Sequence, residues 1–259
     1  VHSKVCVIDR IEEGKVKRYG FISTGNFNEN TAKIYTDNTL FTADSAILKD
    51  ASKVFEFFEV NYKVHRYKHL FVSPHYTRLK FNKLIDREIL NAIDGKEAYI
   101  KLKMNSLTDF KMIDKLYDAS RAGVKIQLII RGICCLIPGV QGMSENIEAI
   151  SIVDKYLEHS RIYIFGNEGN PDVFISSADF MTRNLDARVE VTCPIYDENI
   201  KQELIDTFEI GWKANVKARI HSDDLKNRYR KPEGEKPFRA QAELYRYYQN
   251  KLEVIAERV

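Results

Sequence analysis

The chain has 259 residues, with a hydrophobic content of 44% and a charged content of 30%, which fits one large or two ordinary soluble globular domains with a hydrophobic core. A net charge of +3 is too small for a protein that coats nucleic acid, although it leaves room for a local basic site. No signal peptide or apolar run of membrane length is found, so we expect a cytoplasmic protein; membrane association is possible but not indicated by the sequence. The cysteines contain no C-x-x-C pair and are expected to be reduced thiols: Cys6, Cys134, Cys135 and Cys193.

The predicted elements begin with a hairpin. Two short strands, at 5–9 and 19–24, are rich in β-branched and aromatic residues. A polar run from Arg10 to Arg18 separates them, and the glycine at position 14 predicts a turn. The first part of the chain is completed by a turn at 25–30, an extended piece at 40–45, a helix over about 46–60 capped by Asp44 or Ser45, and a linker at 61–76.

Strands and helices alternate after the linker. A strand at 98–104, a helix at 108–121 and a strand at 124–131 have the lengths of a βαβ unit, so the sheet should be at least partly parallel. Arg131 ends the second strand, directly before a long loop at 132–142, and such loops are where the sites of α/β proteins gather. Ser106 or Thr108 is the expected cap of the helix at 108–121, and the other elements are helices at 78–93, 198–212 and 238–256 and strands at 148–153, 161–165, 172–177 and 187–194.

The strongest local motif lies at the start of the chain, where His2, Lys4 and Asp9 spell H-x-K-x4-D in an extended segment. Residues two apart in a strand point to the same face, so the imidazole and the ammonium should lie together. This pairing suits a nucleophile that attacks phosphorus while the lysine holds phosphate oxygens. A strand whose histidine merely adjoins a lysine is the plainer interpretation. Because the chain lacks an initiator Met and starts one residue before this motif, we expect a piece of a longer protein.

A second passage repeats the first. A His-Ser-basic strand at 2–4, a hairpin and a Phe-Ile-Ser-Thr-Gly-Asn run at 21–26 are matched by His-Ser-Arg at 159–161, a hairpin shorter by four residues and Phe-Ile-Ser-Ser-Ala-Asp at 174–179. The ordered match predicts two similar domains that face each other, although duplication without a shared site is the alternative. The residues expected to converge on one site are His2, Lys4, Asn26, His159, Arg161 and Asp179.

These motifs resemble known families. H-x-K-x4-D followed by a Ser-Thr-Gly-Asn turn is similar to the signature of the phospholipase D superfamily, which uses two such half-sites and a phosphohistidine intermediate. Longer passages, at 22–37, 131–138, 149–159 and 176–184, resemble the bacterial polyphosphate kinase family nearly end to end. The resemblance implies an α/β fold of two phospholipase D-like domains with mixed sheets flanked by helices: the later part of a first catalytic domain at 1–69, incomplete at its N-terminus, and a whole second one with its C-terminal helix at 70–259.

The same resemblance implies a function and its residues. The family enzymes transfer the terminal phosphate of ATP reversibly to inorganic polyphosphate, with the catalytic histidine at His2 and nucleotide contacts at Tyr35, Arg131 and His159. The family's magnesium-associated arginines would lie upstream of Val1, so magnesium is an expected cofactor without a metal site in this chain. The second motif departs from the phospholipase D pattern by having Arg161 for Lys, no Asp at Gly166, and Asp179 for Asn.

The residue chemistry agrees with this reading. His2 would attack the terminal phosphorus while Lys4, Arg131 and Arg161 neutralise charge on the phosphoryl oxygens. A protonated His159 could assist the leaving oxygen, Tyr35 could stack on adenine, and Asp37 is expected to orient an arginine or lysine. A polyanion path lined in part by Arg183 and Arg188 is a further hypothesis.

Two functional interpretations remain open. The first is a polyphosphate kinase whose partners are ATP or ADP and polyphosphate, without nucleic acid, homo-oligomeric in its full-length form. The alternative is a phospholipase D-type phosphodiesterase or nuclease that uses the same paired histidines, His2 and His159.

Overall fold

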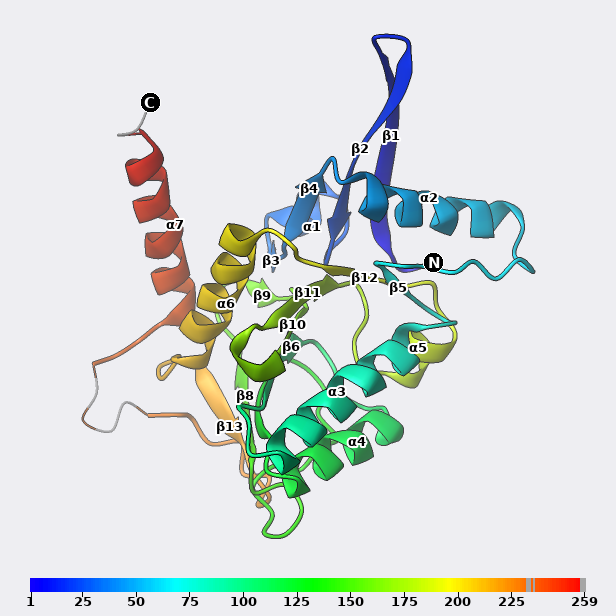
Figure 1. Ribbon diagram of the computed structural model, residues 1–259. Coiled ribbons are helices and arrows are strands. Elements are labelled where there is room, and N and C mark those ends of the chain that lie inside the picture. The colour runs from blue at the N-terminus through cyan, green and yellow to red at the C-terminus, as the bar shows by residue number, and fades with distance from the viewer. Residues whose placement is uncertain (232–233, 235, 257–259) are drawn as a thin grey trace.

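A computed structural model of the chain describes residues 1–231, 234 and 236–256. Its main element is an eight-stranded mixed sheet in the order β13-β8-β7-β6-β10-β11-β12-β5 (Figure 1). The strands of this sheet are β5 (Phe71–Val72), β6 (Tyr99–Met104), β7 (Lys125–Ile130), β8 (Ile147–Ile152), β10 (Ile162–Phe165), β11 (Asp172–Ser176), β12 (Val191–Pro194) and β13 (Ala218–His221). The predicted βαβ unit is confirmed, because β6 and β7 pair in parallel and the helix between them packs on the sheet.

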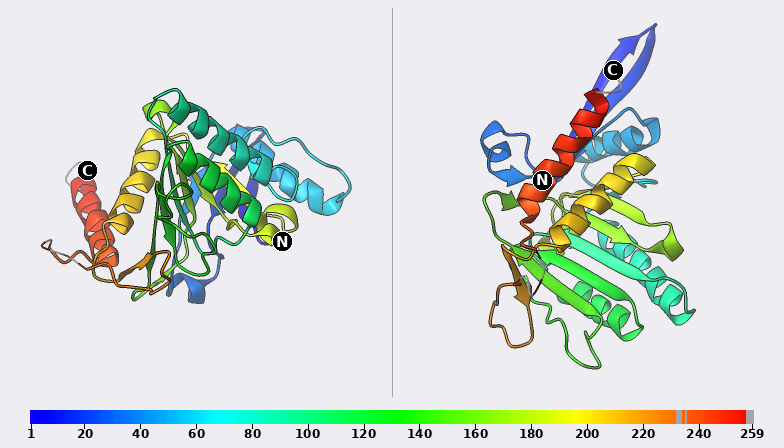
Figure 2. Two further views of the ribbon diagram at one scale, coloured as in Figure 1. Left: turned by 90° about the horizontal axis from the view of Figure 1, so that it is seen from below. Right: turned by 90° about the vertical axis from the view of Figure 1, so that its left-hand side faces the viewer.

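Helices cover both faces of the large sheet. Figure 2 shows α3 (Thr77–Ile93) and α4 (Phe110–Arg121) on one side and α6 (Glu198–Trp212) on the other. Strand β10 lies between these layers and is buried on both faces: its residues Ile162 and Ile164 join the core under α6, while Tyr163 and Phe165 join the core under α3 and α4. A central strand that is apolar at every position is what this position requires. The α/β class with mixed sheets flanked by helices is therefore confirmed.

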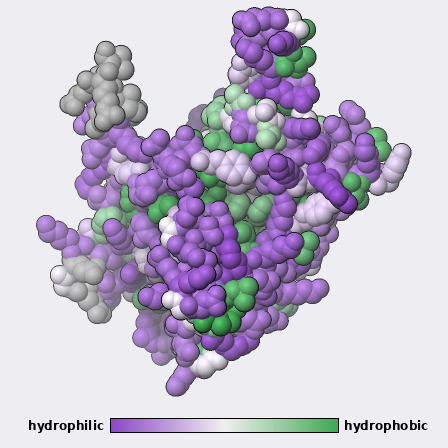
Figure 3. All heavy atoms as spheres, viewed as in Figure 1, coloured by the Kyte–Doolittle hydropathy of each residue, from purple (hydrophilic) through white to green (hydrophobic). Residues whose placement is uncertain are grey.

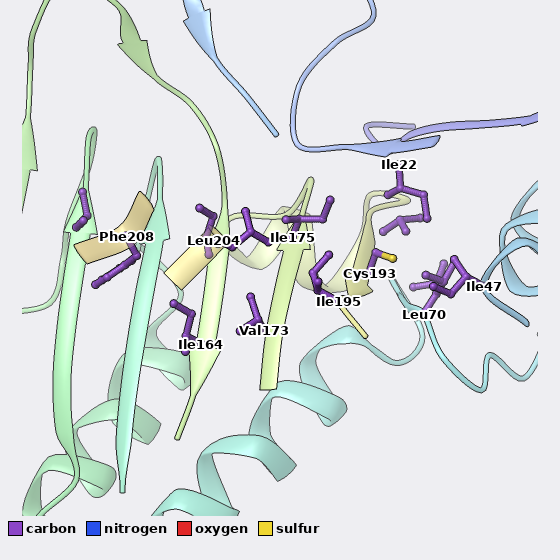
Figure 4. Packing of buried hydrophobic residues seen from close by; sticks show 14 of the residues in the cluster. Ile22, Ile47, Leu70, Ile164, Val173, Ile175, Cys193, Ile195, Leu204 and Phe208 are labelled. Atoms are coloured by element: carbon purple, nitrogen blue, oxygen red, sulfur yellow. The ribbon is translucent and has the colours of Figure 1, made fainter. Parts of the chain in front are cut away.

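The first part of the chain forms a smaller antiparallel sheet, in the order β1 (Lys4–Glu12), β2 (Lys15–Ser23) and β4 (Thr39–Thr42). Helix α2 (Ser45–Glu59) begins at its N-cap Asp44, whose carboxylate accepts from two backbone amides. The buried side chains of Ile22 and Ile47 belong to the same apolar cluster as Cys193 (Figure 4). The two sheets are thus joined by a common core, which fixes the first motif relative to the second.

The predicted hairpin and its turn at Gly14 are confirmed, but the predicted extent of the turn, from Arg10 to Arg18, is wrong. The ladder instead continues from Lys4↔Ser23 to Glu12↔Lys15, and only Glu13 and Gly14, both at positive φ, make the turn. The resulting hairpin projects from the body of the protein and carries mainly hydrophilic side chains (Figures 1 and 3). Cross-strand ion pairs such as Arg18–Asp9 explain its polarity, because both faces of the projecting part meet solvent.

Other boundaries also differ from the sequence expectation. Asp109, rather than Ser106 or Thr108, caps α4, since its carboxylate accepts from the amide of Met112. The predicted linker contains β5, and the segment between the predicted helices at 198–212 and 238–256 contains β13, which pairs with β8. The remaining elements are α1 (Glu29–Ala32), β3 (Tyr35–Thr36), β9 (Leu157–Glu158), a 3-10 turn (Asn167–Gly169), α5 (Thr182–Asp186) and α7 (Ala240–Ala256). Within the described residues, no helix is long and apolar enough to span a membrane.

Candidate active site

His2 enters the site from the segment that leads into β1. The chain end lies beside β12, and the amide of His2 donates to the carbonyl of Val189 at 2.9 Å (Figure 1). The ring Nδ1 lies 2.9 Å from the carboxylate of Glu190, which is fully buried. Because a carboxylate only accepts here, Nδ1 carries the proton and Nε2 keeps a free lone pair. That tautomer is the one a nucleophilic histidine needs.

Glu190 is itself fixed by two donors. The hydroxyl of Ser177 donates to one carboxylate oxygen at 2.5 Å, and the side-chain amide of Asn184 donates to the other. A buried carboxylate with this many donors keeps one orientation. The histidine is therefore held by a rigid acceptor that comes from the second half of the chain.

His159 is held in the same way by the first half. It follows β9, and its Nδ1 lies 2.8 Å and 3.0 Å from the two carboxylate oxygens of Asp37. The hydroxyl of Thr24 donates to Asp37 at 2.7 Å. The expectation that Asp37 orients an arginine or lysine is wrong, because the side chains that hydrogen-bond to its carboxylate are those of His159 and Thr24. The ring of Tyr35 lies 4.9 Å from the ring of His159, centroid to centroid.

Each half-site supplies the carboxylate that hydrogen-bonds to the histidine of the other half. Thr24 and Asp37 are thirteen residues apart and serve His159, while Ser177 and Glu190 are also thirteen apart and serve His2. The backbone repeats as well, because the amide of Asn38 donates to the hydroxyl of Thr24 as the amide of Val191 donates to that of Ser177. The carboxylate that holds each histidine therefore comes from the opposite half, as a site shared by the two halves requires.

Lys4 occupies the centre of this arrangement. It is 6% exposed, and its ammonium donates to the carbonyl of His2. Burial lowers the pKa of Lys4 to about 8, an effect that Glu190 and Asp37 oppose and that Arg161 and Arg188 reinforce. Charged groups from both halves therefore shift the pKa of Lys4. Arg188, which belongs to the hypothesised polyanion path, is one of them.

Arg161 is the most constrained cation of the site. Its guanidinium is 3% exposed and contacts both oxygens of Asp179, at 3.2 Å and 3.3 Å. Its Nη1 donates to the carbonyls of Thr24 and His159, and it lies 3.1 Å from Nε2 of His159. Since a guanidinium can only donate, Nε2 of His159 is the acceptor in this arrangement. The predicted role of His159 as a proton donor therefore requires Arg161 to shift.

The remaining predicted residues differ in how they are placed. Arg131 donates from Nε to the side chain of Asn105 at 3.0 Å, and Asn105 in turn contacts the carbonyl of His159 at 3.4 Å. Asn26 is exposed and makes no side-chain hydrogen bond to the described residues, whereas its repeat partner Asp179 anchors Arg161. The structure thus brings Arg131 to the site and leaves Asn26 at the solvent edge.

Sequence reasoning missed Glu190 and Asn105. Glu190 lies in an alternating run, Val-Glu-Val, in which a charged residue is expected to face solvent. The signal that could have identified it is the repeat itself, because aligning Ser177 with Thr24 places Glu190 opposite Asp37. Asn105 carries no motif, and only the pairing of β6 with β7 places it beside Arg131.

The described residues do not offer a metal site. Among them, no group of three or more His, Cys, Asp or Glu side chains is arranged to hold a metal ion. Asp37 and Glu190 are each already engaged by a histidine and a hydroxyl. The magnesium that the resemblance implies therefore has no ligand set among the described residues.

Two histidine–carboxylate pairs flanked by buried cations form a duplicated histidine site, an arrangement that suits nucleophilic attack on phosphorus. Comparison with known families makes this specific. Residues 70–241 match the family described as polyphosphate kinase C-terminal domain 2, and residues 1–64 match polyphosphate kinase C-terminal domain 1. The chain belongs to the polyphosphate kinase family.

Individual relatives agree with this assignment. The chain is 47% identical to the polyphosphate kinases of Vibrio parahaemolyticus, over 96% of its residues, and of Escherichia coli, over 95%. The crystal structure of polyphosphate kinase from Porphyromonas gingivalis superimposes with a TM-score of 0.92 at 45% identity, over 98% of this chain and 39% of that one. The chain spans 36% of the length of the Vibrio and Escherichia relatives.

Proposed function

We propose that this chain supplies the histidine site of an ATP:polyphosphate phosphotransferase, which moves the terminal phosphate of ATP to polyphosphate through a phosphohistidine at His2. The observation that carries this proposal is the hydrogen bond between Nδ1 of His2 and the buried carboxylate of Glu190. It leaves Nε2 unprotonated and aimed by a fixed partner, as a nucleophile requires. Membership of the polyphosphate kinase family supports the choice of substrates.

In the first step, Nε2 of His2 attacks the γ-phosphorus of ATP. A P–N bond forms as the bond from that phosphorus to the β,γ-bridging oxygen breaks, and ADP leaves with the electron pair. In the second step, a terminal oxygen of polyphosphate attacks the phosphohistidine, a P–O bond forms, and the pair of the broken P–N bond returns to Nε2. The negative Glu190 stabilises the imidazole as positive charge develops on it in each direction.

The cations stabilise the phosphoryl group during both steps. Lys4, in its protonated form, lies beside His2, and Arg131 lies beside His159. The transition state of phosphoryl transfer spreads charge over three equatorial oxygens, so positioned cations supply most of the rate enhancement. A bound phosphate would also compete with Nε2 of His159 for Arg161. Its arrival would free His159 to assist the leaving oxygen.

The nucleotide would enter past Tyr35 and Arg131. The ring of Tyr35 packs against His159 and is half-buried, so one face remains for adenine to stack on. Magnesium would arrive with the nucleotide. We also propose that the natural protein acts in the cytoplasm as a homo-oligomer and has no nucleic-acid partner.

The phosphodiesterase alternative uses the same histidines, so the experiment must separate the two reactions. The natural full-length protein is incubated with γ-labelled ATP and magnesium, beside the His2→Ala and His221→Ala variants. We expect acid-labile, base-stable label on the wild type and on His221→Ala, and none on His2→Ala. Metal-independent cleavage of a phosphodiester with no label from ATP would overturn the kinase proposal in favour of the alternative.

A further inference from the structure

Strands β3 and β9 carry the groups around His159, yet their pairing is very short. Only Tyr35↔Leu157 and Thr36↔Glu158 are paired. Two residues of ladder are marginal as an independent unit, so the ladder alone does not explain why Asp37 and Tyr35 are fixed against His159. The support must come from side chains.

Glu158 lies at the centre of that support. Its side chain is nearly fully buried, and it accepts from the Lys103 ammonium at 2.6 Å on β6 and from the Thr36 hydroxyl at 3.3 Å on β3. Burial alone would raise the pKa of Glu158, but Lys103 and the hydrogen bonds lower it overall, so the carboxylate stays ionised. Thr36 also accepts from the amide of His159 at 3.3 Å. One carboxylate thus joins two strands directly beside the histidine.

The C-terminal helix completes the same network. Gln241, in the first turn of α7, donates to Glu158 at 2.8 Å. Its side-chain amide also donates to the carbonyl of Tyr156 at 2.8 Å and accepts from the amide of Tyr156 at 3.0 Å. A neighbouring strand would also bond to both the N–H and the C=O of one residue. Gln241 therefore extends the β3–β9 pairing by one residue, Tyr156.

The network has no counterpart in the first half. The repeat aligns His2 with His159, and the residue aligned with Glu158 is Val1, which has no carboxylate. The residue aligned with Thr36 is Val189, which offers only its carbonyl to the amide of His2. The buried carboxylate therefore serves His159 alone and is not a general feature of the duplicated strand.

We propose that Glu158 is a positioning residue for His159 and that α7 takes part in the active-site support through Gln241. The carboxylate fixes the β3–β9 pair, and with it the distance between Asp37 and the imidazole. The effect on turnover rests on the proposed function, whereas the effect on the His159 ring does not.

The test uses the natural full-length protein with Gln241→Ala, and with Gln249→Ala as the matched control. Gln249 lies two turns further along α7, lines the same surface hollow and makes no side-chain hydrogen bond to Tyr156 or Glu158 among the described residues. We measure kcat and KM for ATP, the thermal midpoint, and the ring ¹⁵N signals of His159, which report its tautomer. Glu158→Gln is the second variant, and its fold is checked first because it leaves Lys103 without a charged partner.

We expect Gln241→Ala to lower kcat about tenfold with little change in KM, and to move the ring signals of His159, because small misplacements of catalytic groups are costly. Gln249→Ala should change none of these. A fall in the thermal midpoint with unchanged kcat and unchanged His159 signals would show a merely structural role and overturn the proposal. If the wild type transfers no phosphate, the proposed function fails, and the ring signals alone decide the positioning role.

Discussion

Glu190 and His2 are 188 residues apart in the sequence and are joined by a 2.9 Å hydrogen bond between a fully buried carboxylate and Nδ1. Asp37 and His159 form the reciprocal pair at 2.8 Å across the same site. Because each carboxylate comes from the half that does not contain its histidine, neither half can orient its own histidine alone. The duplicated halves are therefore functionally inseparable.

The first prediction concerns that tautomer. Glu190→Gln keeps the shape of the side chain but removes its charge and can present an N–H to Nδ1, which would move the proton to Nε2. We expect the rate of label transfer from γ-labelled ATP to His2 to fall by about 10²–10⁴-fold, the order observed when a histidine loses its orienting carboxylate. The measurement is single-turnover labelling.

The control is Glu148→Gln, which removes an exposed carboxylate from β8 and should label at the wild-type rate. Equal labelling by the Glu190→Gln protein would show that the Glu190–His2 bond does not set the tautomer.

The second prediction concerns pH and Lys4. Burial lowers the pKa of Lys4 to about 8 from 10.5, so its charge is lost as the pH rises through 8, and phosphoryl transfer should decline over that range. Stability should move the other way. Between about pH 8 and 10.5 the unfolded chain holds a proton that the folded chain has released, so this group's contribution to the free energy of unfolding rises with pH.

The check is a pH profile of kcat beside urea unfolding at each pH. In Lys4→Arg the cation stays charged throughout, so the decline in kcat near pH 8 should disappear. If kcat of the wild type and of Lys4→Arg declines over the same pH range, a group other than Lys4 controls the loss of activity at alkaline pH.

The third prediction follows from Gly25, which packs directly against the carboxylate of Asp37. A Cβ at this position would lie 1.8 Å from Oδ2 of Asp37, and Asp37 cannot yield easily because Thr24 and His159 hold it. We expect Gly25→Ala to destabilise the protein by about 1–3 kcal/mol and to reduce turnover by displacing Asp37.

The repeat provides the matched variant. Ala178 stands at the equivalent position of the second half, so that half already accommodates a Cβ beside Glu190. Ala178→Gly should leave turnover near the wild-type value, at a small cost in stability. Unfolding in urea and steady-state rates measure both effects, and full activity in the Gly25→Ala protein would contradict the packing argument.

The success of sequence reasoning depended on whether the signal was local. The helix predicted at 198–212 coincides with α6, because Asp197 caps it and its apolar period is regular. The strands of the first hairpin were predicted too short because a strand exposed on both faces has the composition of a turn. His2, Lys4, His159 and Arg161 were found because a repeat marks them, whereas their partners are set by tertiary pairing.

Asp179 is the clearest case of a residue whose partner could not be predicted from the sequence. The repeat predicts that Asp179 converges on the site with the histidines and the basic residues, since it matches Asn26. In the structure, both of its oxygens contact Arg161, and one accepts from the amide of Asn105. The exchange of Lys for Arg and of Asn for Asp in the second half is therefore one coupled change, because the guanidinium needs a charged and bidentate partner.

The last prediction tests that coupling. Asp179→Ala leaves the buried guanidinium of Arg161 without its counter-charge, and we expect a loss of about 3–5 kcal/mol in the free energy of unfolding. Asn26→Ala, at the matching position, removes an exposed side chain and should change stability by no more than about 0.5 kcal/mol. Urea titrations of both variants give the comparison.

The double variant Arg161→Lys, Asp179→Asn recreates the pattern of the first half and should recover part of the loss, since an ammonium can reach the carbonyl of His159 as Lys4 reaches that of His2. A double variant no more stable than Asp179→Ala would show that the two substitutions are independent.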